Sequence, residues 1–180
     1  MILCWLNKLP NQWTPAGSGE GRIGTGIGPA ASIQLADMNG DGRADYLVID
    51  PDNGSVRVWW NYGPHAAWAD GWMWKEGGVI ATGVPHANWK TLRFADINGD
   101  GRADYVYIGA GGSLAHWLNT GTTGGEDVQW TEMGGIASGD CPDADHLVLA
   151  DVSVCKHWGV VCVRACGMLT KHGPDRRRRP

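Results

Sequence analysis

Two nearly identical loops carry the side chains whose types and spacing are best suited to chemistry. One reads Asp-Met-Asn-Gly-Asp-Gly-Arg-Ala-Asp from residue 37, and the other reads Asp-Ile-Asn-Gly-Asp-Gly-Arg-Ala-Asp from residue 96. Carboxylate and amide oxygens stand at alternate positions, and such a run can wrap around a hard cation such as calcium, which takes roughly six to eight oxygen ligands. The sequence therefore predicts a calcium site in each loop.

The expected oxygen donors occupy the same positions in both loops. In the first loop they are Asp37, Asn39, Asp41, the backbone carbonyl of Arg43, and Asp45. In the second loop they are Asp96, Asn98, Asp100, the backbone carbonyl of Arg102, and Asp104. A glycine, Gly42 or Gly101, follows the third donor of each loop. A residue without Cβ enters the left-handed conformations of a sharp turn at little cost.

Neither loop fits an EF-hand, which begins in a similar way. An EF-hand needs a bidentate Glu at its twelfth position and a helix on each side. The twelfth positions here are Val48 and Tyr107, and the residues after each loop, 46–49 and 105–108, are aromatic or branched aliphatic. Such residues favour strands. A calcium loop that joins two strands is the better interpretation, and the second copy weakens the alternative that these residues form ordinary turns.

The repetition extends beyond the loops. One set of equivalent positions is the Trp-x-Asn motif at 5–7, 59–61 and 117–119, a second is Trp13, Trp74 and Trp130, and a third is the segments 23–26, 80–83 and 136–139. An Asn-Gly pair at 53–54, between strand-like residues, predicts a hairpin. A unit of about sixty residues with about four short strands is typical of a propeller blade.

These motifs resemble the FG-GAP/VCBS repeat of integrin α-subunit propellers and of many secreted microbial proteins. The resemblance rests on Asp-x-Asn-Gly-Asp-Gly-Arg-x-Asp-Tyr followed by a strand, a turn and Trp-x-Asn-x-Gly, and it covers roughly residues 3–152. It implies an all-β fold, namely a partial β-propeller built from four-stranded blades with calcium loops. It also implies structural Ca2+ and an extracellular role in adhesion or ligand binding, or attachment to a secreted hydrolase, lyase or esterase.

The repeat pattern stops inside a third loop. Region 1–152 is expected to hold a partial blade, two loop-bearing repeats and a truncated third loop, in which only Asp151 remains of the ligand set. Residues 153–180 depart from the repeat, and we expect a disordered or aberrant tail, such as the read-through of an unspliced intron. Its cysteines match no common zinc-site spacing, and the five cysteines of the chain leave their pairing open. Its arginine run, 176–179, is expected to be solvated.

Composition narrows the function classes. The 28 glycines and 11 tryptophans in 180 residues suit tight turns and tryptophan-rich strands. A formal net charge of −4 gives no general nucleic-acid footprint, and no apolar run is long enough for a membrane span. The sequence holds no Gly-x-Ser-x-Gly, His-Glu-x-x-His or P-loop motif, so we expect no enzyme activity. The family resemblance implies an extracellular location, although no signal peptide is recognisable.

Tryptophans are the side chains that could contact a ligand. Trp and Tyr present flat apolar surfaces and dominate many protein interfaces. Trp68, Trp72 and Trp89 fall outside the repeated positions and could form a surface for a glycan or an extracellular protein, whereas the repeated tryptophans are expected to pack between blades. Three classes stay open: a calcium-stabilised module for binding or adhesion, a non-catalytic appendage of a secreted carbohydrate-active enzyme, and an incomplete gene product. In the first two, the remaining blades or a catalytic domain belong to a longer parent chain.

Overall fold

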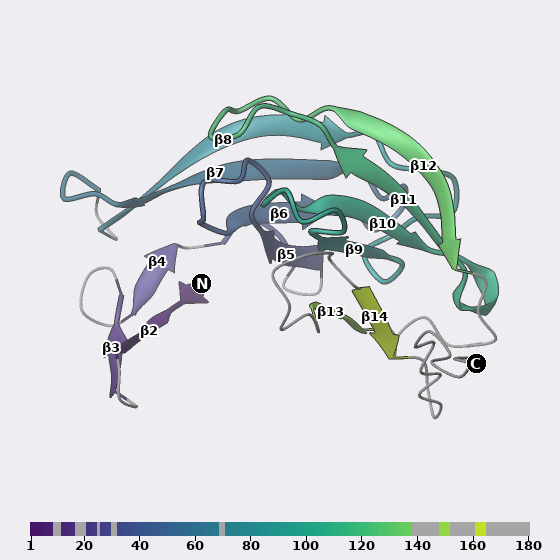
Figure 1. Ribbon diagram of the computed structural model, residues 1–180. Helices are drawn as coiled ribbons and strands as arrows, with labels where there is room; N and C mark the ends of the chain where they lie inside the picture. The colour runs from purple at the N-terminus through teal and green to yellow at the C-terminus, as the bar shows by residue number, and fades with distance from the viewer. Residues whose placement is uncertain are drawn as a thin grey trace, which may run out of the picture.

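Antiparallel β-structure dominates the chain. The computed structural model describes residues 1–8, 12–16, 21–24, 26–29, 32–68, 71–137, 148–151 and 161–164. Two four-stranded antiparallel sheets form the centre of the molecule (Figure 1). The described residues contain no α-helix and include the short 3₁₀ turn η2 (Ala110–Gly112). The expected all-β class is therefore confirmed.

The first repeat sheet contains four strands in chain order. They are β5 (Ile33–Ala36), β6 (Asp45–Ile49), β7 (Val56–Pro64) and β8 (Trp72–Ala81). The Asn53-Gly54 pair lies in the turn between β6 and β7, where Gly54 has a φ of 71°. The amide of Asp50 donates to the carbonyl of Ser55 at 2.8 Å and closes this hairpin. The predicted hairpin is confirmed.

The second repeat sheet has the same order of strands. They are β9 (Leu92–Ala95), β10 (Asp104–Ile108), β11 (Leu114–Asn119) and β12 (Trp130–Ala137). Strand β9 contacts β5 of the first repeat sheet. In Figure 1, β8 and β12 lie along the top of the two sheets, and β5 and β9 lie beneath them. The two sheets therefore stand next to each other in equivalent orientations.

Shorter strands flank the two repeat sheets. Strand β1 (Ile2–Leu3) pairs with β4 (Arg22–Gly24), β2 (Trp5–Lys8) pairs with β3 (Gln12–Pro15), and β13 (Val148–Asp151) pairs with β14 (Val161–Arg164). Strand β14 lies within the segment 153–180, where the sequence led us to expect a disordered tail. The rest of that segment, with most of its cysteines and its arginine run, lies outside the described residues, so the expectation for it stays a prediction.

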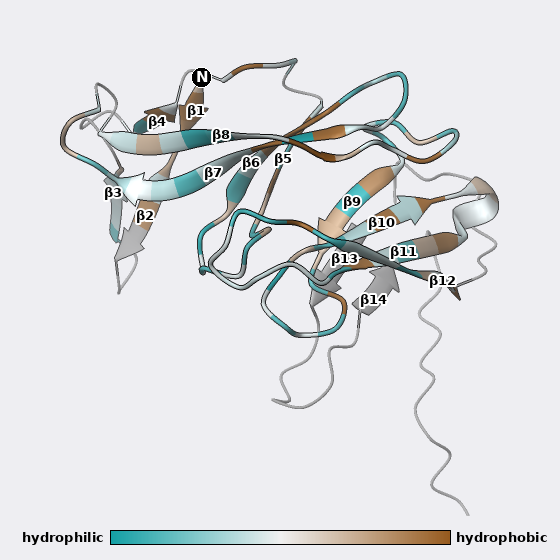
Figure 2. Cartoon of the chain, turned by 90° about the horizontal axis from the view of Figure 1, so that it is seen from above, coloured by the Kyte–Doolittle hydropathy of each residue, from teal (hydrophilic) through white to brown (hydrophobic). Residues whose placement is uncertain are grey.

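The core lies between the two repeat sheets. Its buried residues come from both of them and from the loops: Met38, Leu47, Ile49, Val56, Val58, Trp60, Ala87, Leu92, Ala103 and Tyr105. Side chains of a strand point alternately to its two faces, and Val56, Val58 and Trp60 of β7 are buried while Arg57 between them is exposed. Figure 2 shows this interleaving of apolar and hydrophilic residues along β9. Among the described residues there is no helix that could cross a membrane.

Candidate functional site

The first loop joins β5 to β6 and folds around the side chain of Asp37. The Asp37 carboxylate accepts backbone N–H groups from Gly40 at 2.7 Å, Asp41 at 3.2 Å and Gly42 at 2.8 Å. Gly42 has a φ of 83°, which a residue with a Cβ adopts only at a cost. The aspartate and the glycine together therefore determine the shape of the loop.

The second loop joins β9 to β10 and repeats this geometry. Asp96 accepts N–H groups from Gly99 at 2.7 Å, Asp100 at 3.2 Å and Gly101 at 2.9 Å. Gly101 has a φ of 88°. The two loops thus share one hydrogen-bond pattern, as their sequences predicted.

A buried aspartate closes each loop at its base. Asp45 is fully buried, and its two carboxylate oxygens accept the N–H groups of Met38 at 3.0 Å and Asn61 at 2.9 Å. Burial raises the pKa of Asp45 to about 6, and the nearby charges of Asp41 and Asp37 add to the rise while the two hydrogen bonds oppose it. Asp45 is therefore a buried acid that other carboxylates surround.

Asp104 has the same position in the second loop. It is fully buried and accepts the N–H groups of Ile97 and Asn119, both at 2.8 Å. Burial raises its pKa, and the charges of Asp100 and Asp96 contribute in the same direction. Both loops thus concentrate negative charge, which disfavours the ionised form of the buried aspartate.

The arginine of each loop partly balances this charge. Arg43 pairs with the Asp41 carboxylate at 2.5 Å and also donates from Nε to the carbonyl of Asn61 at 2.7 Å. Arg102 pairs with Asp100 at 2.5 Å and donates from Nε to the carbonyl of Asn119 at 3.0 Å. Each arginine therefore occupies one carboxylate oxygen of a predicted calcium ligand, Asp41 in the first loop and Asp100 in the second.

Asn61 and Asn119 belong to the site, although we assigned them no role from the sequence. The Asn61 side-chain amide donates to the carbonyl of Ala44 at 2.8 Å and accepts from the Trp72 indole N–H at 2.6 Å. The fully buried Asn119 donates to the carbonyl of Ala103. Each asparagine thus ties the neighbouring strand to the base of its loop. The signal that could have revealed this is the repeated Trp-x-Asn motif.

The second repeat also holds the first loop from outside. The carbonyl oxygens of Asp37, Met38 and Asn39 accept hydrogen bonds from the Ala103 amide at 2.7 Å, the Asn119 side chain at 2.7 Å and the Gly124 amide at 2.6 Å, respectively. Three successive carbonyls are therefore fixed by groups that lie far along the chain. The conformation of the first loop depends on the second repeat.

The predicted ligands of each loop lie close together, but their side chains are bonded to one another. Asn39 donates from Nδ2 to Asp41 at 3.3 Å and accepts the Asp41 amide at its Oδ1 at 3.2 Å. Asn98 and Asp100 form the same two contacts, at 2.9 and 3.0 Å. In the described part of the chain, no three acidic, histidine or cysteine side chains converge in a way that could hold a metal ion.

The three candidate ligand-surface tryptophans differ in their environments. Trp68 is 47% exposed. Trp72 is half-buried, and its indole N–H is held by Asn61. Trp89 packs partly against the core, with the ammonium of Lys90 5.4 Å from its ring centre. Trp68 is therefore the most exposed of the three.

Comparison with known families agrees with the repeated loop-and-strand structure described above. Residues 37–107 match the FG-GAP-like repeat family, which confirms the resemblance over that segment. The match begins at the first residue of the first loop and ends in β10, so it covers both loops and the strands between them. No curated protein and no solved structure gives a match to this chain. The region is thus a β-propeller-like repeat module.

Proposed function

We propose that this chain is a calcium-stabilised module for extracellular ligand binding or adhesion, because residues 37–107 match the FG-GAP-like repeat family. The two repeat sheets are then neighbouring blades of a β-propeller. In this proposal the chain acts by binding and not by catalysis. The observation that carries the calcium part is the duplicated loop: Asp37 and Asp41 lie in one hydrogen-bonded turn that the buried Asp45 closes, and Asp96, Asp100 and Asp104 repeat this arrangement.

The donor types in the loops suit a hard cation, and the side chains would have to turn from their present hydrogen-bond partners to converge on it. Each loop offers carboxylate and amide oxygens within one turn, and calcium prefers such ligands. A divalent ion would relieve the repulsion among Asp37, Asp41 and Asp45, which the single guanidinium of Arg43 offsets only in part. In the first loop the ion would be held by Asp37, Asn39, Asp41, the backbone carbonyl of Arg43, and Asp45. In the second it would be held by Asp96, Asn98, Asp100, the backbone carbonyl of Arg102, and Asp104.

The melting temperature measured with calcium and with a chelator tests this part of the proposal. An ion that binds the folded state and not the unfolded chain raises stability by mass action. We expect millimolar calcium to raise the melting temperature, with a Kd on the order of 10⁻⁴–10⁻³ M, as in extracellular calcium modules. The double variant Asp41→Ala/Asp100→Ala should lose the shift.

Asp52→Ala is the matched control, because Asp52 is an exposed aspartate outside both loops. It removes one carboxylate and should keep the calcium shift. An identical melting curve for the unmodified chain with and without millimolar calcium would refute the calcium part.

The ligand surface is proposed at Trp68, Trp72 and Trp89, with Trp68 as the main contact because its ring is the most exposed of the three. An exposed indole ring can stack on the apolar face of a sugar. A glycan array probed with the whole chain tests this, and Trp68→Ala should reduce any signal more than Trp72→Ala does. Trp13→Ala is the control, since Trp13 is 63% exposed on β3 and is not part of the proposed surface. The absence of any glycan signal would leave a protein partner as the ligand.

A further inference from the structure

The hairpin turn between β6 and β7 carries an Asn-Gly-Ser tripeptide at residues 53–55. This is the Asn-x-Ser/Thr acceptor sequence of N-linked glycosylation, and it occurs once in the chain. The modification needs an asparagine with an available side-chain amide, a hydroxyl residue two positions later, and a place on the surface. The fold of the turn decides whether these three requirements are met.

The turn leaves the Asn53 side chain at the surface. Pro51, Asp52 and Asn53 are all exposed. The side-chain oxygen Oδ1 of Asn53 accepts the backbone N–H of Ser55 at 2.8 Å, a bond that asparagine often makes in turns. Among the described residues, none bonds to the Asn53 nitrogen Nδ2. The atom that would bear a glycan is therefore available.

Ser55 supports the turn through its backbone and not through its hydroxyl. Its amide donates to the Asn53 side chain, and its carbonyl accepts the amide of Asp50 at 2.8 Å. No group in the described part of the chain bonds to the Ser55 hydroxyl. The two side-chain groups that glycosylation requires are thus groups that the folded turn does not use.

The equivalent hairpin of the second repeat closes without this tripeptide. The amide of Gly109 donates to the carbonyl of Ser113 at 2.7 Å, as in the first hairpin. Residues 111–113 are Gly-Gly-Ser, and the Ser113 hydroxyl is used within the turn, where it donates to the carbonyl of Ala110 at 3.1 Å. Closing the hairpin therefore does not require an asparagine, and the acceptor tripeptide is specific to the first repeat.

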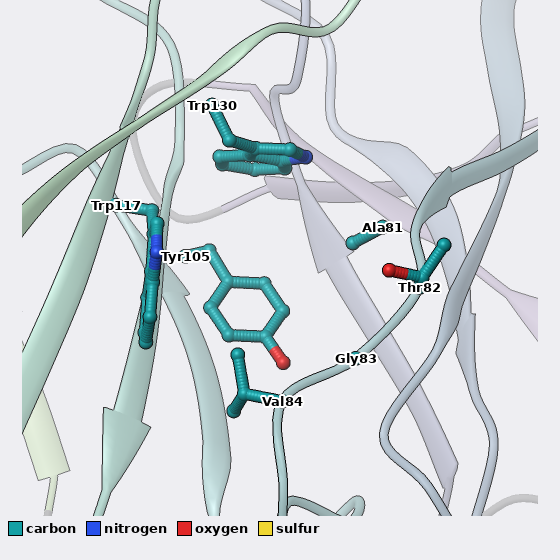
Figure 3. A pocket seen from close by; sticks show the side chains of 7 residues that line it. All are labelled: Ala81, Thr82, Gly83, Val84, Tyr105, Trp117 and Trp130. Carbon is teal, nitrogen blue, oxygen red and sulfur yellow. The ribbon is translucent and has the colours of Figure 1, made fainter.

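The inner side of the turn is packed against the protein. A Cβ at Gly83 would come within 2.1 Å of the carbonyl oxygen of Asn53, and a Cβ at Gly54 would come within 2.7 Å of the Ala87 side chain. Figure 3 shows the segment that contains Gly83 beside the ring of Tyr105 in the second repeat sheet. A glycan therefore has room on the exposed side of the turn, where the Asn53 side chain lies.

The turn lies at the opposite end of β6 from the first loop. That loop ends at Asp45, the first residue of β6, and the turn begins at Asp50, directly after its last residue. A strand advances about 3.4 Å per residue, so roughly 17 Å separate the two ends. Strand β7 runs back from the turn, and Trp68 follows its far end. A glycan on Asn53 would thus leave the first loop and Trp68 uncovered.

We propose that Asn53 is a site of N-linked glycosylation. In the transfer, Nδ2 of Asn53 forms a bond to the anomeric carbon of an oligosaccharide carried on a lipid pyrophosphate. The bond from that carbon to the pyrophosphate oxygen breaks, the lipid pyrophosphate leaves with the electron pair, and Nδ2 releases one proton. An oligosaccharyltransferase of the secretory pathway catalyses this step, and the chain is its substrate. The proposal rests on the extracellular location in the proposed function and not on calcium or Trp68.

Expression of the whole chain behind a cleavable secretion signal in eukaryotic cells tests the proposal. Cell and medium fractions are both treated with peptide N-glycosidase in heavy-oxygen water and analysed by peptide mass spectrometry. We expect the chain to lose the mass of one oligosaccharide and residue 53 to become a labelled aspartate. Ser55→Ala should carry no glycan, although it keeps Asn53 and the bond from the residue 55 amide. Ser113→Ala, the matched change in the second hairpin, should keep the glycan.

Gly111→Asn provides a positive control, because it builds the same tripeptide at residues 111–113. Gly111 has a φ of 69°, a conformation that asparagine adopts more readily than most residues. This variant should carry a second glycan. The proposal is overturned if Asn53 is unmodified in a chain whose secretion signal has been removed, or if Ser55→Ala keeps the glycan. The calcium shift in melting temperature should be the same before and after glycan removal. Its absence from both samples would refute the calcium part alone.

Discussion

Trp130 donates its indole N–H to the backbone carbonyl oxygen of Ile80 at 2.7 Å, and so the last strand of the second repeat sheet is bonded to the end of the first. Trp74 makes the same bond to Ile23, one repeat earlier, at 2.6 Å. The repeated tryptophan and the repeated isoleucine of the sequence are therefore partners across successive repeats. This pairing explains why the two positions recur together.

Trp130→Phe should destabilise the protein by about 1–2 kcal/mol, because it removes the indole N–H, leaves the Ile80 carbonyl without this donor, and reduces the buried ring area. Urea unfolding measures the change. Trp13→Phe is the control on an exposed ring, and its effect should stay within about 0.5 kcal/mol. Equal effects of the two substitutions would show that the bond to Ile80 contributes little.

Asn119→Ala should cost about 2–3 kcal/mol, because Asn119 is fully buried and donates to carbonyl oxygens of both repeats. The substitution leaves the buried Met38 carbonyl without its donor. Asn53→Ala is the matched control, since Asn53 is an exposed turn residue that accepts one local hydrogen bond. Chemical denaturation of both variants should show the larger loss for Asn119. A loss no larger than that of Asn53→Ala would contradict this assignment.

The loops were predictable from the sequence because their structure is local. Asp37 accepts bonds from residues three to five positions later, so the spacing of Asp and Gly contains the information. The role of Asn119 was not predictable, because its partner Met38 is 81 residues away in the chain. Pairing across that distance depends on how the two sheets stand next to each other, which no local pattern specifies.

The tryptophans also show that a local sequence pattern does not specify contacts between distant parts of the chain. Equivalent positions predicted equivalent packing, and Trp74 and Trp130 do pack between repeats. Trp13, at the same repeat position, is 63% exposed. Trp72 was expected at a ligand surface, but its indole N–H is bonded to Asn61. A pattern identifies equivalent positions along the chain, whereas burial depends on the neighbouring strands that are present at each one.

The two repeated tyrosines should respond differently to removal of their hydroxyls. Tyr46→Phe removes the acceptor for the Ile27 amide and should cost about 1 kcal/mol. The buried Tyr105 hydroxyl lies near the Val84 amide but forms no hydrogen bond of ordinary geometry, so Tyr105→Phe should cost less than Tyr46→Phe. Thermal unfolding of the two variants in parallel provides the comparison, with each serving as the control for the other. A larger loss for Tyr105→Phe would mean that its hydroxyl is bonded in solution.

Arg43→Gln should strengthen calcium binding to the first loop. Arg43 pairs with Asp41 at 2.5 Å, so a calcium ion that uses Asp41 must displace this contact. Arg43 is exposed, and exposed ion pairs contribute about 0.2–1 kcal/mol. The expected gain in affinity is therefore about 1.4-fold to fivefold, measured by calorimetry in an Asp100→Ala background that leaves only the first loop intact.

Arg57→Gln is the matched control for that substitution, because Arg57 is an exposed arginine on β7 outside the loop. It makes the same change in net charge and should leave the calcium affinity nearly unchanged at physiological ionic strength. If Arg43→Gln weakens calcium binding, then Arg43 acts chiefly through its bond to the Asn61 carbonyl. The guanidinium would then be a support for the calcium-bound loop, and the competition between arginine and calcium for Asp41 would be refuted.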